Sequence, residues 1–430
     1  MRNIKVFLGA VLCGLGSIAL AQTTNIESFK LPDTFLNTVT PRTAHADEAR
    51  ALTGASKHGV KSFATTGLPG VDTLTNWSDQ FTAAGYDNNG NPQSVWPYTM
   101  VGTPPESGQT TSFNAPIVPV TVELLDASGN VAVYKGHRLI FNASQSIVTN
   151  IVNSPTYQPW LYTNGTGQFN DQMFRAEFWS RISEEGEGNG WHNILQPKVR
   201  TTRRMQIPSG YWYFAVDANN HPVAAIVDAN TFSNLLFPPT YPVDNSTVIG
   251  AAELAGDITT HDISTFLFNN VYLYVNTIQN CCILGFHSYD YEPGDSQNGN
   301  LLRYYVVNYS SWISPGLFGG GFEDVTAHSH EMSETFNDPF VDNATPWWGS
   351  GGNCQNNLET GDVIEGLNSL VTYSTTGHNL TYHPQNEALF SWFASQSPSH
   401  ARLGAYSFPD ETTLRKLSPG NLLPNCVAAP

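Results

Sequence analysis

The stretch His328-Ser-His-Glu-Met-Ser-Glu-Thr-Phe-Asn-Asp-Pro339 decides how this chain is interpreted. His330, Glu331 and Glu334 have the spacing i, i+1, i+4 of the zinc-peptidase helix H-E-x-x-H, with a glutamate in place of the second histidine. Positions i and i+4 lie on one face of a helix, so His330 and Glu334 are predicted to bind the same ion. Glu331 projects beside them and is predicted to accept a proton from metal-bound water.

A second acidic segment, Glu359-Thr-Gly-Asp362, follows a stretch rich in Trp and Gly. Peptidases with an H-E-x-x-H helix often take their third ligand from such a later acidic residue, so Glu359 is the predicted third metal ligand. Asp362 is the alternative ligand, or a hydrogen-bond partner of a ligand histidine. His328 is likewise predicted to be an alternative ligand or a hydrogen-bond partner of a ligand, because residues i and i+2 point to different sides of a helix. The remaining candidates depend on where the fold places them: His287, His378 and His383.

Zinc is the first expected ion, although the ligand set is unusual. One histidine and two carboxylates make a zinc site formally neutral, which lowers the pKa of bound water less than a site that keeps a positive charge. Oxygen-rich ligands also admit manganese, magnesium or calcium. The competing interpretation is an ordinary polar helix with solvated carboxylates. The local gathering of acids and a histidine in a chain with 13% charged residues favours the metal site.

The first residues have the layout of a secretory signal. Arg2 and Lys5 form a basic end, an apolar run covers residues 6–20, and Ala19-Leu-Ala21 supplies small residues before a cut ahead of Gln22. The apolar run is too short to span a bilayer comfortably, and no later segment is long and apolar enough. We therefore predict a secreted or periplasmic protein without a membrane span.

Composition agrees with export. The formal net charge of −17 argues against nucleic acid and anionic membranes as partners. Few charged residues, 12% aromatic residues and abundant Asn, Ser, Thr, Gly and Pro are typical of an exported, loop-rich β protein.

Four cysteines lie outside the signal, and an even number in an oxidising compartment predicts two disulfides. A bond between the adjacent Cys281 and Cys282 is geometrically awkward. We therefore expect each of them to bond separately to Cys354 or Cys426, in either combination.

Several segments organise the chain. Residues 1–21 are the signal peptide, 22–75 an extended arm or pro-segment, 76–280 a strand-rich N-terminal part and 281–430 the part with the metal helix. Residues 276–430 can also pack with the strand-rich N-terminal part as one domain. Alternating apolar residues predict a hairpin over 116–141 and later strands, and helical spacing predicts the helices. The other expected elements are strands at 211–216, 223–227, 271–275 and 304–307, a loop at 285–300, and helices at 168–180, 324–337 and 386–394. This is an α+β fold with a mixed or antiparallel sheet core that bears the metal helix.

The block from Ala327 to Pro339, with Trp347-Trp348 and the later segment from Gly351 to Asp362, resembles a group of exported, mostly uncharacterised bacterial proteins. Those proteins carry an H-E-x-[AS]-E helix, a D-P stop and a later N-L-E-x-G-D segment. Residues 169–179 and 281–287 are also similar to that group. More distantly, the chain is similar to Exordium-type secreted proteins, which have H-E-L-A-E and E-I-G-D. The resemblance implies export and a metallopeptidase-like helix, zincin-like in part.

Two functions are therefore expected. The first is a secreted metal-dependent hydrolase, a zinc peptidase foremost, acting on a protein or peptide. The second is a non-catalytic extracellular or cell-surface protein with a structural metal or a vestigial site, whose aromatic rings contact glycans. An open cleft over His330 would favour the enzyme, whereas ligands sealed under Trp347 and Trp348 would favour the second function.

Overall fold

The computed structural model describes residues 25–53, 66–87, 89–184, 187–239, 241–296, 298–350, 353–365, 373–374 and 380–414. The predicted signal peptide, the expected new terminus at Gln22, His378 and Cys426 lie outside these residues.

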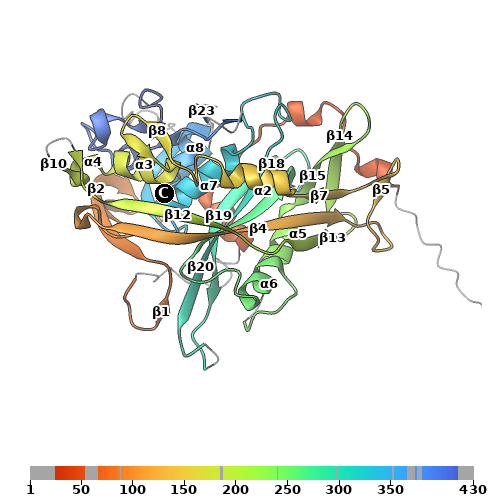
Figure 1. Cartoon of the computed structure of the whole chain (residues 1–430), viewed down its shortest axis with the longest axis horizontal. Coiled ribbons are helices and arrows are strands. Elements are labelled where there is room, and N and C mark those ends of the chain that lie inside the picture. The colour runs from red at the N-terminus through yellow and green to blue at the C-terminus, as the bar shows by residue number, and fades with distance from the viewer. Residues whose placement is uncertain are drawn as a thin grey trace, which may run out of the picture.

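An eight-stranded mixed sheet forms the centre of the molecule (Figure 1). Its main path runs β1–β20–β16–β4–β12, with β7 and β13 paired to β4 and β19 paired to β20. Neighbours run parallel except for β19 with β20 and β7 with β4. Their bounds are β1 Val71–Asp72, β4 Thr110–Leu124, β7 Ile140–Asn142, β12 His192–Val199, β13 Arg203–Ile207, β16 Ile263–Asn269, β19 Gly285–Glu292 and β20 Leu302–Trp312. The predicted α+β class with a strand-rich core is confirmed.

A four-stranded sheet, β14–β15–β17–β18, holds the strands predicted near residues 211, 223 and 271. Helices α5 and α6 follow β15 and lie below the long strand β4 in Figure 1. Asp228 begins α5 by accepting a hydrogen bond from the Thr231 amide, which satisfies one free donor of the first turn. The bounds are β14 Trp212–Val216, β15 Pro222–Asp228, β17 Val271–Tyr274, β18 Cys281–Ile283, α5 Ala229–Leu236 and α6 Val248–Leu254.

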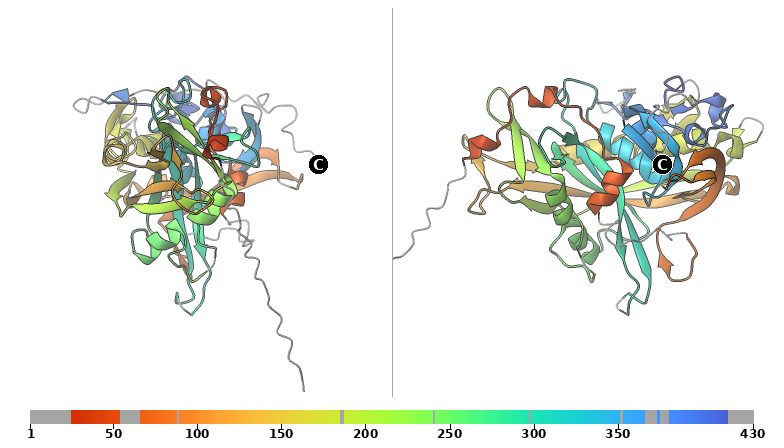
Figure 2. Two further views of the ribbon diagram at one scale, coloured as in Figure 1. Left: turned by 90° about the vertical axis from the view of Figure 1, so that its right-hand side faces the viewer. Right: turned by 180° about the vertical axis from the view of Figure 1, so that it is seen from behind.

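Helix α7 (Thr326–Asn337) is the predicted metal helix, and every one of its side chains is buried. It packs on β19 and β20, with α3 (Phe169–Glu177) and α8 (Thr360–Glu365) beside it (Figure 2). The helix ends just before Asp338-Pro339, as expected of a proline that cannot continue the backbone hydrogen bonds. A helix buried on all sides needs partners for its polar side chains, so the residues around α7 show what these side chains can bind.

The remaining α-helices and strands include the long hairpin of β2 and β3. They are α1 Ala46–Thr53, α2 Gln145–Val152, α4 Trp179–Ile182, α9 Phe390–Phe393, β2 Asn76–Tyr86, β3 Pro92–Val101, β5 Val133–Tyr134, β6 His137–Arg138, β8 Trp160–Tyr162, β9 Gly165–Gly167, β10 Ser183–Glu184, β11 Glu187–Gly188, β21 Ala344–Ser350, β22 Asn353–Asn357, β23 Tyr373–Ser374, β24 Thr381–Tyr382, β25 Glu387–Ala388 and β26 Ser407–Phe408.

Three expectations about local structure are wrong. Residues 285–300 are not all loop, because 285–292 form β19, a strand buried along nearly its whole length between β20 and α7. The turn of the hairpin over 116–141 forms as predicted, closed by an antiparallel bridge between Leu125 and Val131, but the strands pair differently: β4 pairs with β7, while the segment around 133 forms its own small hairpin with 137–138. The last helix is the single turn α9. In each case long-range pairing overrides the local pattern.

Part of the predicted arm belongs to the core. Ala46, Ala49 and Leu52 of α1 are buried in a cluster with strands of both sheets. Arg42 forms a parallel bridge to Ile283 of β18, and the Ala44 amide donates to the Gly285 carbonyl. These contacts place residues 42–45 on the side of β19 that faces helix α7.

The disulfide prediction for the adjacent cysteines is wrong. Cys281 and Cys282 bond to each other, across a cis peptide bond that places their Cα atoms 3.0 Å apart. Cys354 is also disulfide-bonded. Neither residue of the adjacent pair is therefore available to Cys354.

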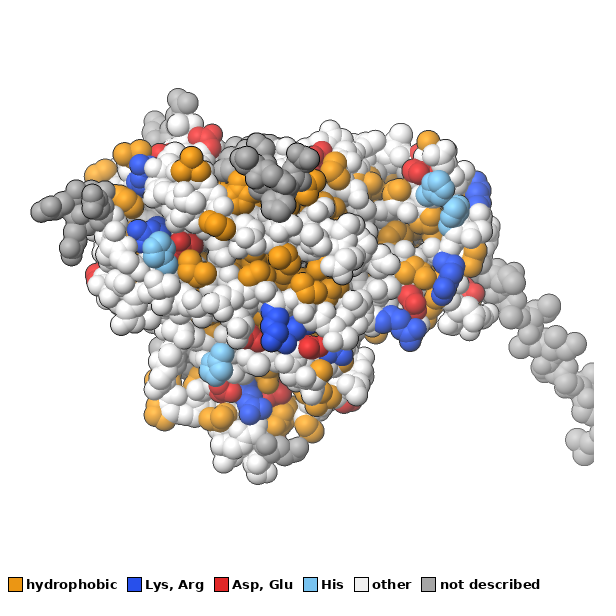
Figure 3. Space-filling model, in the orientation of Figure 1, with side chains coloured by type: hydrophobic (Ala, Val, Ile, Leu, Met, Phe, Trp, Pro, Cys, Tyr) orange, Lys and Arg blue, Asp and Glu red, His pale blue; other side chains and the backbone are white. Residues whose placement is uncertain are grey.

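The surface is poor in charge, as the composition predicts. On the face in Figure 3, Lys and Arg side chains are scattered among uncharged polar groups. Among the described residues no helix is long and apolar enough to cross a membrane.

Candidate metal centre

The predicted site residues converge in the interior. Helix α7 supplies His330, Glu331 and Glu334, the segment before α8 supplies Glu359, and α8 supplies Asp362. The first four have no exposed surface, and Asp362 is 4% exposed. The structure arranges these residues in two adjoining groups, one around His287 and one around His330, and Glu334 has one oxygen close to each histidine.

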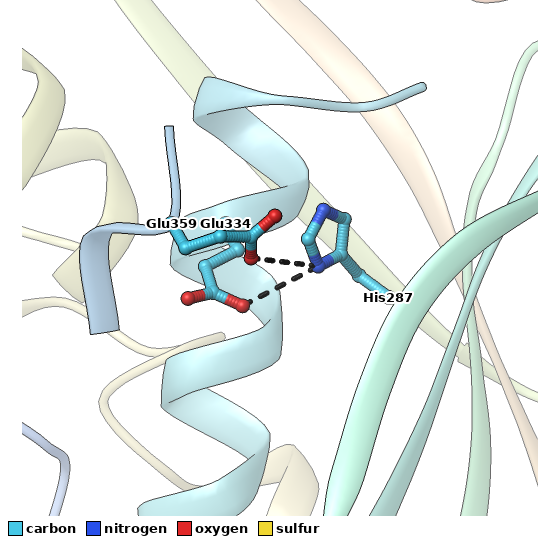
Figure 4. Close-up of side chains that lie close together, drawn as sticks. All are labelled: His287, Glu334 and Glu359. Carbon is cyan, nitrogen blue, oxygen red and sulfur yellow. Dashed lines mark ion pairs between the residues drawn. The ribbon is translucent and has the colours of Figure 1, made fainter. Parts of the chain in front are cut away.

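The first group joins Glu334 and Glu359 to His287 of β19 (Figure 4). The His287 Nδ1 atom lies 3.3 Å from Glu334 Oε2 and 3.8 Å from Glu359 Oε2, and Glu331 Oε2 lies 3.7 Å away. Most of these separations are long for hydrogen bonds. They are close to the separation of roughly 3.3 Å between two ligand atoms that share one tetrahedral zinc ion. His287 thus takes the place expected of His330 beside Glu359.

The other nitrogen of His287 fixes the orientation of the ring. His287 Nε2 lies 3.1 Å from the Asp338 carbonyl oxygen, which can only accept, so Nε2 carries the proton. Among the described residues Nδ1 has no hydrogen-bond partner. A ligand histidine that donates its far N–H to a backbone carbonyl and turns its near nitrogen to carboxylates is typical of metal sites.

The second group surrounds His330. Its Nε2 atom lies 2.9 Å from Glu334 Oε1 and 3.5 Å from Asp362 Oδ1. The ligand atoms around His330 form two overlapping sets, one with Glu331 and Glu334 and one with Asp362 and Glu365. The Thr43 hydroxyl lies 2.8 Å from the same nitrogen, and the Thr43 amide donates to Glu365. Residues of the arm therefore form one wall of the site.

His330 is oriented by the same logic as His287. Gln385 Nε2 donates to the Gly361 carbonyl, which leaves Gln385 Oε1 to accept from His330 Nδ1 at 3.1 Å. The Nε2 lone pair then faces Glu334. The Gly361 amide donates to Glu334 Oε1, and a Cβ atom at Gly361 would overlap the His330 ring. Position 361 therefore requires glycine for close approach.

A third histidine lies at the edge of the second group. His45 Nδ1 is 2.7 Å from Asp362 Oδ2, and Gln355 donates to the same oxygen. Burial lowers the pKa of His45, but Asp362 outweighs it and raises that pKa to about 9. Asp362 consequently has a lowered pKa despite its burial, and stays ionised. Asp362 is thus hydrogen-bonded to His45, a histidine outside the predicted ligand set, and its predicted role beside a ligand histidine stays a prediction.

Carboxylates outnumber the groups that can neutralise them. Burial lowers the pKa of His287, yet Glu359 and the α7 carboxylates raise it well above its ordinary value. Burial and the neighbouring Glu334 raise the pKa of Glu359 well above its usual range. Burial likewise raises the pKa of Glu365 to about 8. A set of acids that holds protons this strongly is also a set that would bind a divalent cation in their place.

Several carboxylate oxygens in the site have no hydrogen-bond partner among the described residues: both of Glu331, both of Glu359, and Oε2 of Glu334. Buried polar atoms are nearly always paired, so unpaired ones call for a ligand. Burial raises the pKa of Glu331 to about 7. A Cβ atom at Gly285 would lie 2.6 Å from Glu331 Oε1, so this glycine makes room for the carboxylate.

Two other histidines do not join these groups. His328 points to the opposite face of α7, with its ring 5.4 Å from that of Tyr157. His383 pairs with Asp324 at 2.7 Å, and together with Glu323 forms a separate cluster just before α7. Asp324 there is already bonded by two amides.

Sequence reasoning missed several residues of the site: Thr43, His45, Gln355, Glu365 and Gln385. The alternation of 285–292, with Phe286, Ser288 and Asp290 between His287, Tyr289 and Tyr291, could have identified β19 and so His287. The arm residues give no comparable signal. No family model, curated protein or solved structure matches the chain, so the site is interpreted from its own geometry.

Proposed function

We propose that the protein is an exported metal-dependent hydrolase, with zinc as the first expected ion and a peptide as substrate. The observation that carries this proposal is Glu331, a fully buried carboxylate without a hydrogen-bond partner among the described residues, beside His287, Glu334 and Glu359. One nitrogen and two carboxylate oxygens are a ligand set that zinc accepts.

Each residue has a distinct role in this proposal. His287, Glu334 and Glu359 would hold the ion, which when bound supplies the Lewis acidity that polarises a carbonyl and makes water more acidic. Glu331 would take the proton from the attacking water and pass it to the leaving amine. A pKa of about 7 suits that exchange, because a general base works best with a pKa near the working pH.

A peptide is the substrate that the H-E-x-x-E helix favours, since the variant keeps the glutamate in the position of the peptidase base. The described residues enclose the ligands. A folded protein substrate therefore fits this site poorly, and we expect hydrolysis of short or unfolded peptides.

The second candidate is a non-catalytic exported protein in which the metal braces α7, α8 and β19. Complete burial of the ligands favours it, and Trp348 is also only 3% exposed. The glycan-contacting part of this candidate has weaker support. Among the most exposed of the described large apolar side chains, the aromatic ones are Tyr86 and Tyr211.

Glu331→Gln separates the two candidates. We expect the zinc-loaded wild type to hydrolyse a denatured protein, and the variant to keep its metal and melting temperature while losing about 10²–10⁴-fold in rate. Loss of metal in the variant would make Glu331 a ligand and not a base. A metal-loaded wild type that is inactive on every peptide, but melts at lower temperature when stripped, would establish the bracing role.

Export is tested separately. We expect the protein secreted by its host to begin at Gln22 or close to it. Mass spectrometry that finds residues 1–21 retained on the secreted protein would contradict the signal-peptide interpretation.

A further inference from the structure

We propose that the centre holds two divalent ions bridged by Glu334, one at His287 and one at His330. This inference rests on the metal binding proposed above and extends it. Its basis is that the two oxygens of Glu334 face different histidines: Oε2 lies 3.3 Å from His287 Nδ1, and Oε1 lies 2.9 Å from His330 Nε2. A carboxylate placed between two such nitrogens is the arrangement of a bridging ligand.

One ion does not serve both histidines in this arrangement. No group of described side chains whose ligand atoms all lie within 4.8 Å of one another contains both His287 and His330. Two nitrogens bound to one zinc ion lie at most about 4.2 Å apart, because each bond is about 2.0–2.1 Å long. Two ions about 3.5–4 Å apart, as in other two-metal sites, satisfy both rings.

Each ion has its own further ligands. His287 shares its group with Glu359, whose oxygens have no hydrogen-bond partner among the described residues. His330 shares its group with Asp362 and Glu365. His287 and His330 each share a group with Glu334, and His330 has a further group with Asp362 and Glu365.

Each of the two histidine rings is oriented by a hydrogen bond of its own. His287 donates from Nε2 to the Asp338 carbonyl, and Gln385 accepts from His330 Nδ1. In each ring the other nitrogen is thus the one that faces Glu334. Each ring therefore has the outer hydrogen bond that is typical of a ligand histidine.

The charge of the cluster matches two ions better than one. The two groups and Glu331 bring five carboxylates together in the described interior, and the only further cation in contact with them is His45, on Asp362. With all five carboxylates ionised and His45 protonated, one divalent ion leaves a net charge of −2, whereas two ions balance the charge. Buried charges persist only where they are paired.

Metal stoichiometry tests the proposal. The full chain is stripped with a chelator, dialysed and titrated with Zn²⁺, and bound metal is measured by elemental analysis. We expect two equivalents in the wild type and one each in His287→Ala and His330→Ala. Glu334→Gln, which keeps the size of the side chain, should lose at least one. His383→Ala is the matched control, because it removes a histidine from the separate Glu323–Asp324 cluster, and should retain two.

A spectroscopic measurement guards against variants that fail to fold. Wild-type protein loaded with Mn²⁺ should give the electron paramagnetic resonance spectrum of a spin-coupled pair, and Glu334→Gln should lose the coupling. One equivalent of zinc together with an uncoupled Mn²⁺ spectrum would overturn the two-ion centre and leave the proposed hydrolase intact. Absence of any bound metal in the folded wild type would overturn both.

Discussion

The two faces of helix α7 bury histidines with opposite consequences. His330 and His328 are two residues apart and are both 0–1% exposed. His330 faces Glu334 and Asp362, which outweigh burial and raise its pKa well above the ordinary value. His328 faces the Tyr157 ring, and burial lowers its pKa to about 3. Burial alone therefore does not decide the charge of a histidine; the groups that face it do.

The comparison extends to the carboxylates. Glu334 on the first face is ionised, because His330 lowers its pKa in spite of burial. Glu177 of α3 lies near Asn337, away from the two ligand groups, and burial raises its pKa well above the ordinary value. We propose that the first face binds cations, whereas the other face belongs to the core and holds neutral polar groups. Four substitutions test this contrast between the two faces.

The largest effect is expected for Glu334→Ala, because this residue belongs to both ligand groups. The variant should bind no zinc tightly and should gain no stability from it. Wild type at a free zinc concentration of 100 times the dissociation constant should gain about 2.7 kcal/mol over the stripped protein. Chemical denaturation with and without zinc measures both gains. An equal gain in the variant would place the ion elsewhere.

His328→Leu should leave zinc binding unchanged and remove an acid sensitivity. The folded pKa of about 3 lies below the unfolded value near 6.5, so the unfolded state binds more protons in that window. His328 therefore costs stability as the pH falls from 6.5 towards 3. Between pH 6.5 and 4.5 the variant should lose about 2–3 kcal/mol less than wild type. Parallel denaturation curves at both pH values would contradict the neutral, unpaired state of His328.

Gln385→Leu removes the acceptor that orients His330 but no ligand. Zinc affinity at the His330 position should fall about 10–100-fold, as for other residues that hold a ligand histidine. Affinity at the His287 position should be unchanged, which competition with a zinc-binding dye can resolve. A drop at both positions would indicate a general loss of structure.

The smallest effect is expected for Glu177→Gln. The folded pKa of Glu177 lies above the unfolded value near 4.5, so its contribution is present at acid pH and is lost as the pH rises. The glutamine variant avoids that loss and should be more stable at pH 7 by about 1 kcal/mol, with little difference at pH 4. A less stable variant at pH 7 would mean that Glu177 is ionised and paired.

The sequence predicts one half of this site better than the other. Helical spacing places His330, Glu331 and Glu334 together, and the later acidic segment correctly adds Glu359 and Asp362 to the same interior. The partner of Glu359 is His287, which could not be predicted while its strand was taken for a loop. Thr43 and His45 enter through a backbone bridge to β18, a contact between segments more than 200 residues apart.

Metal-edge anomalous scattering from a crystal of the zinc-loaded full chain tests the proposed two-ion centre most directly, because it locates each ion. We expect two anomalous peaks, one beside His287 Nδ1 and one beside His330 Nε2, with Glu334 between them. A single peak at either histidine would reduce the centre to one ion. No peak in this cluster, with zinc bound only at His383 or on the surface, would contradict the claim that these buried carboxylates form a metal site.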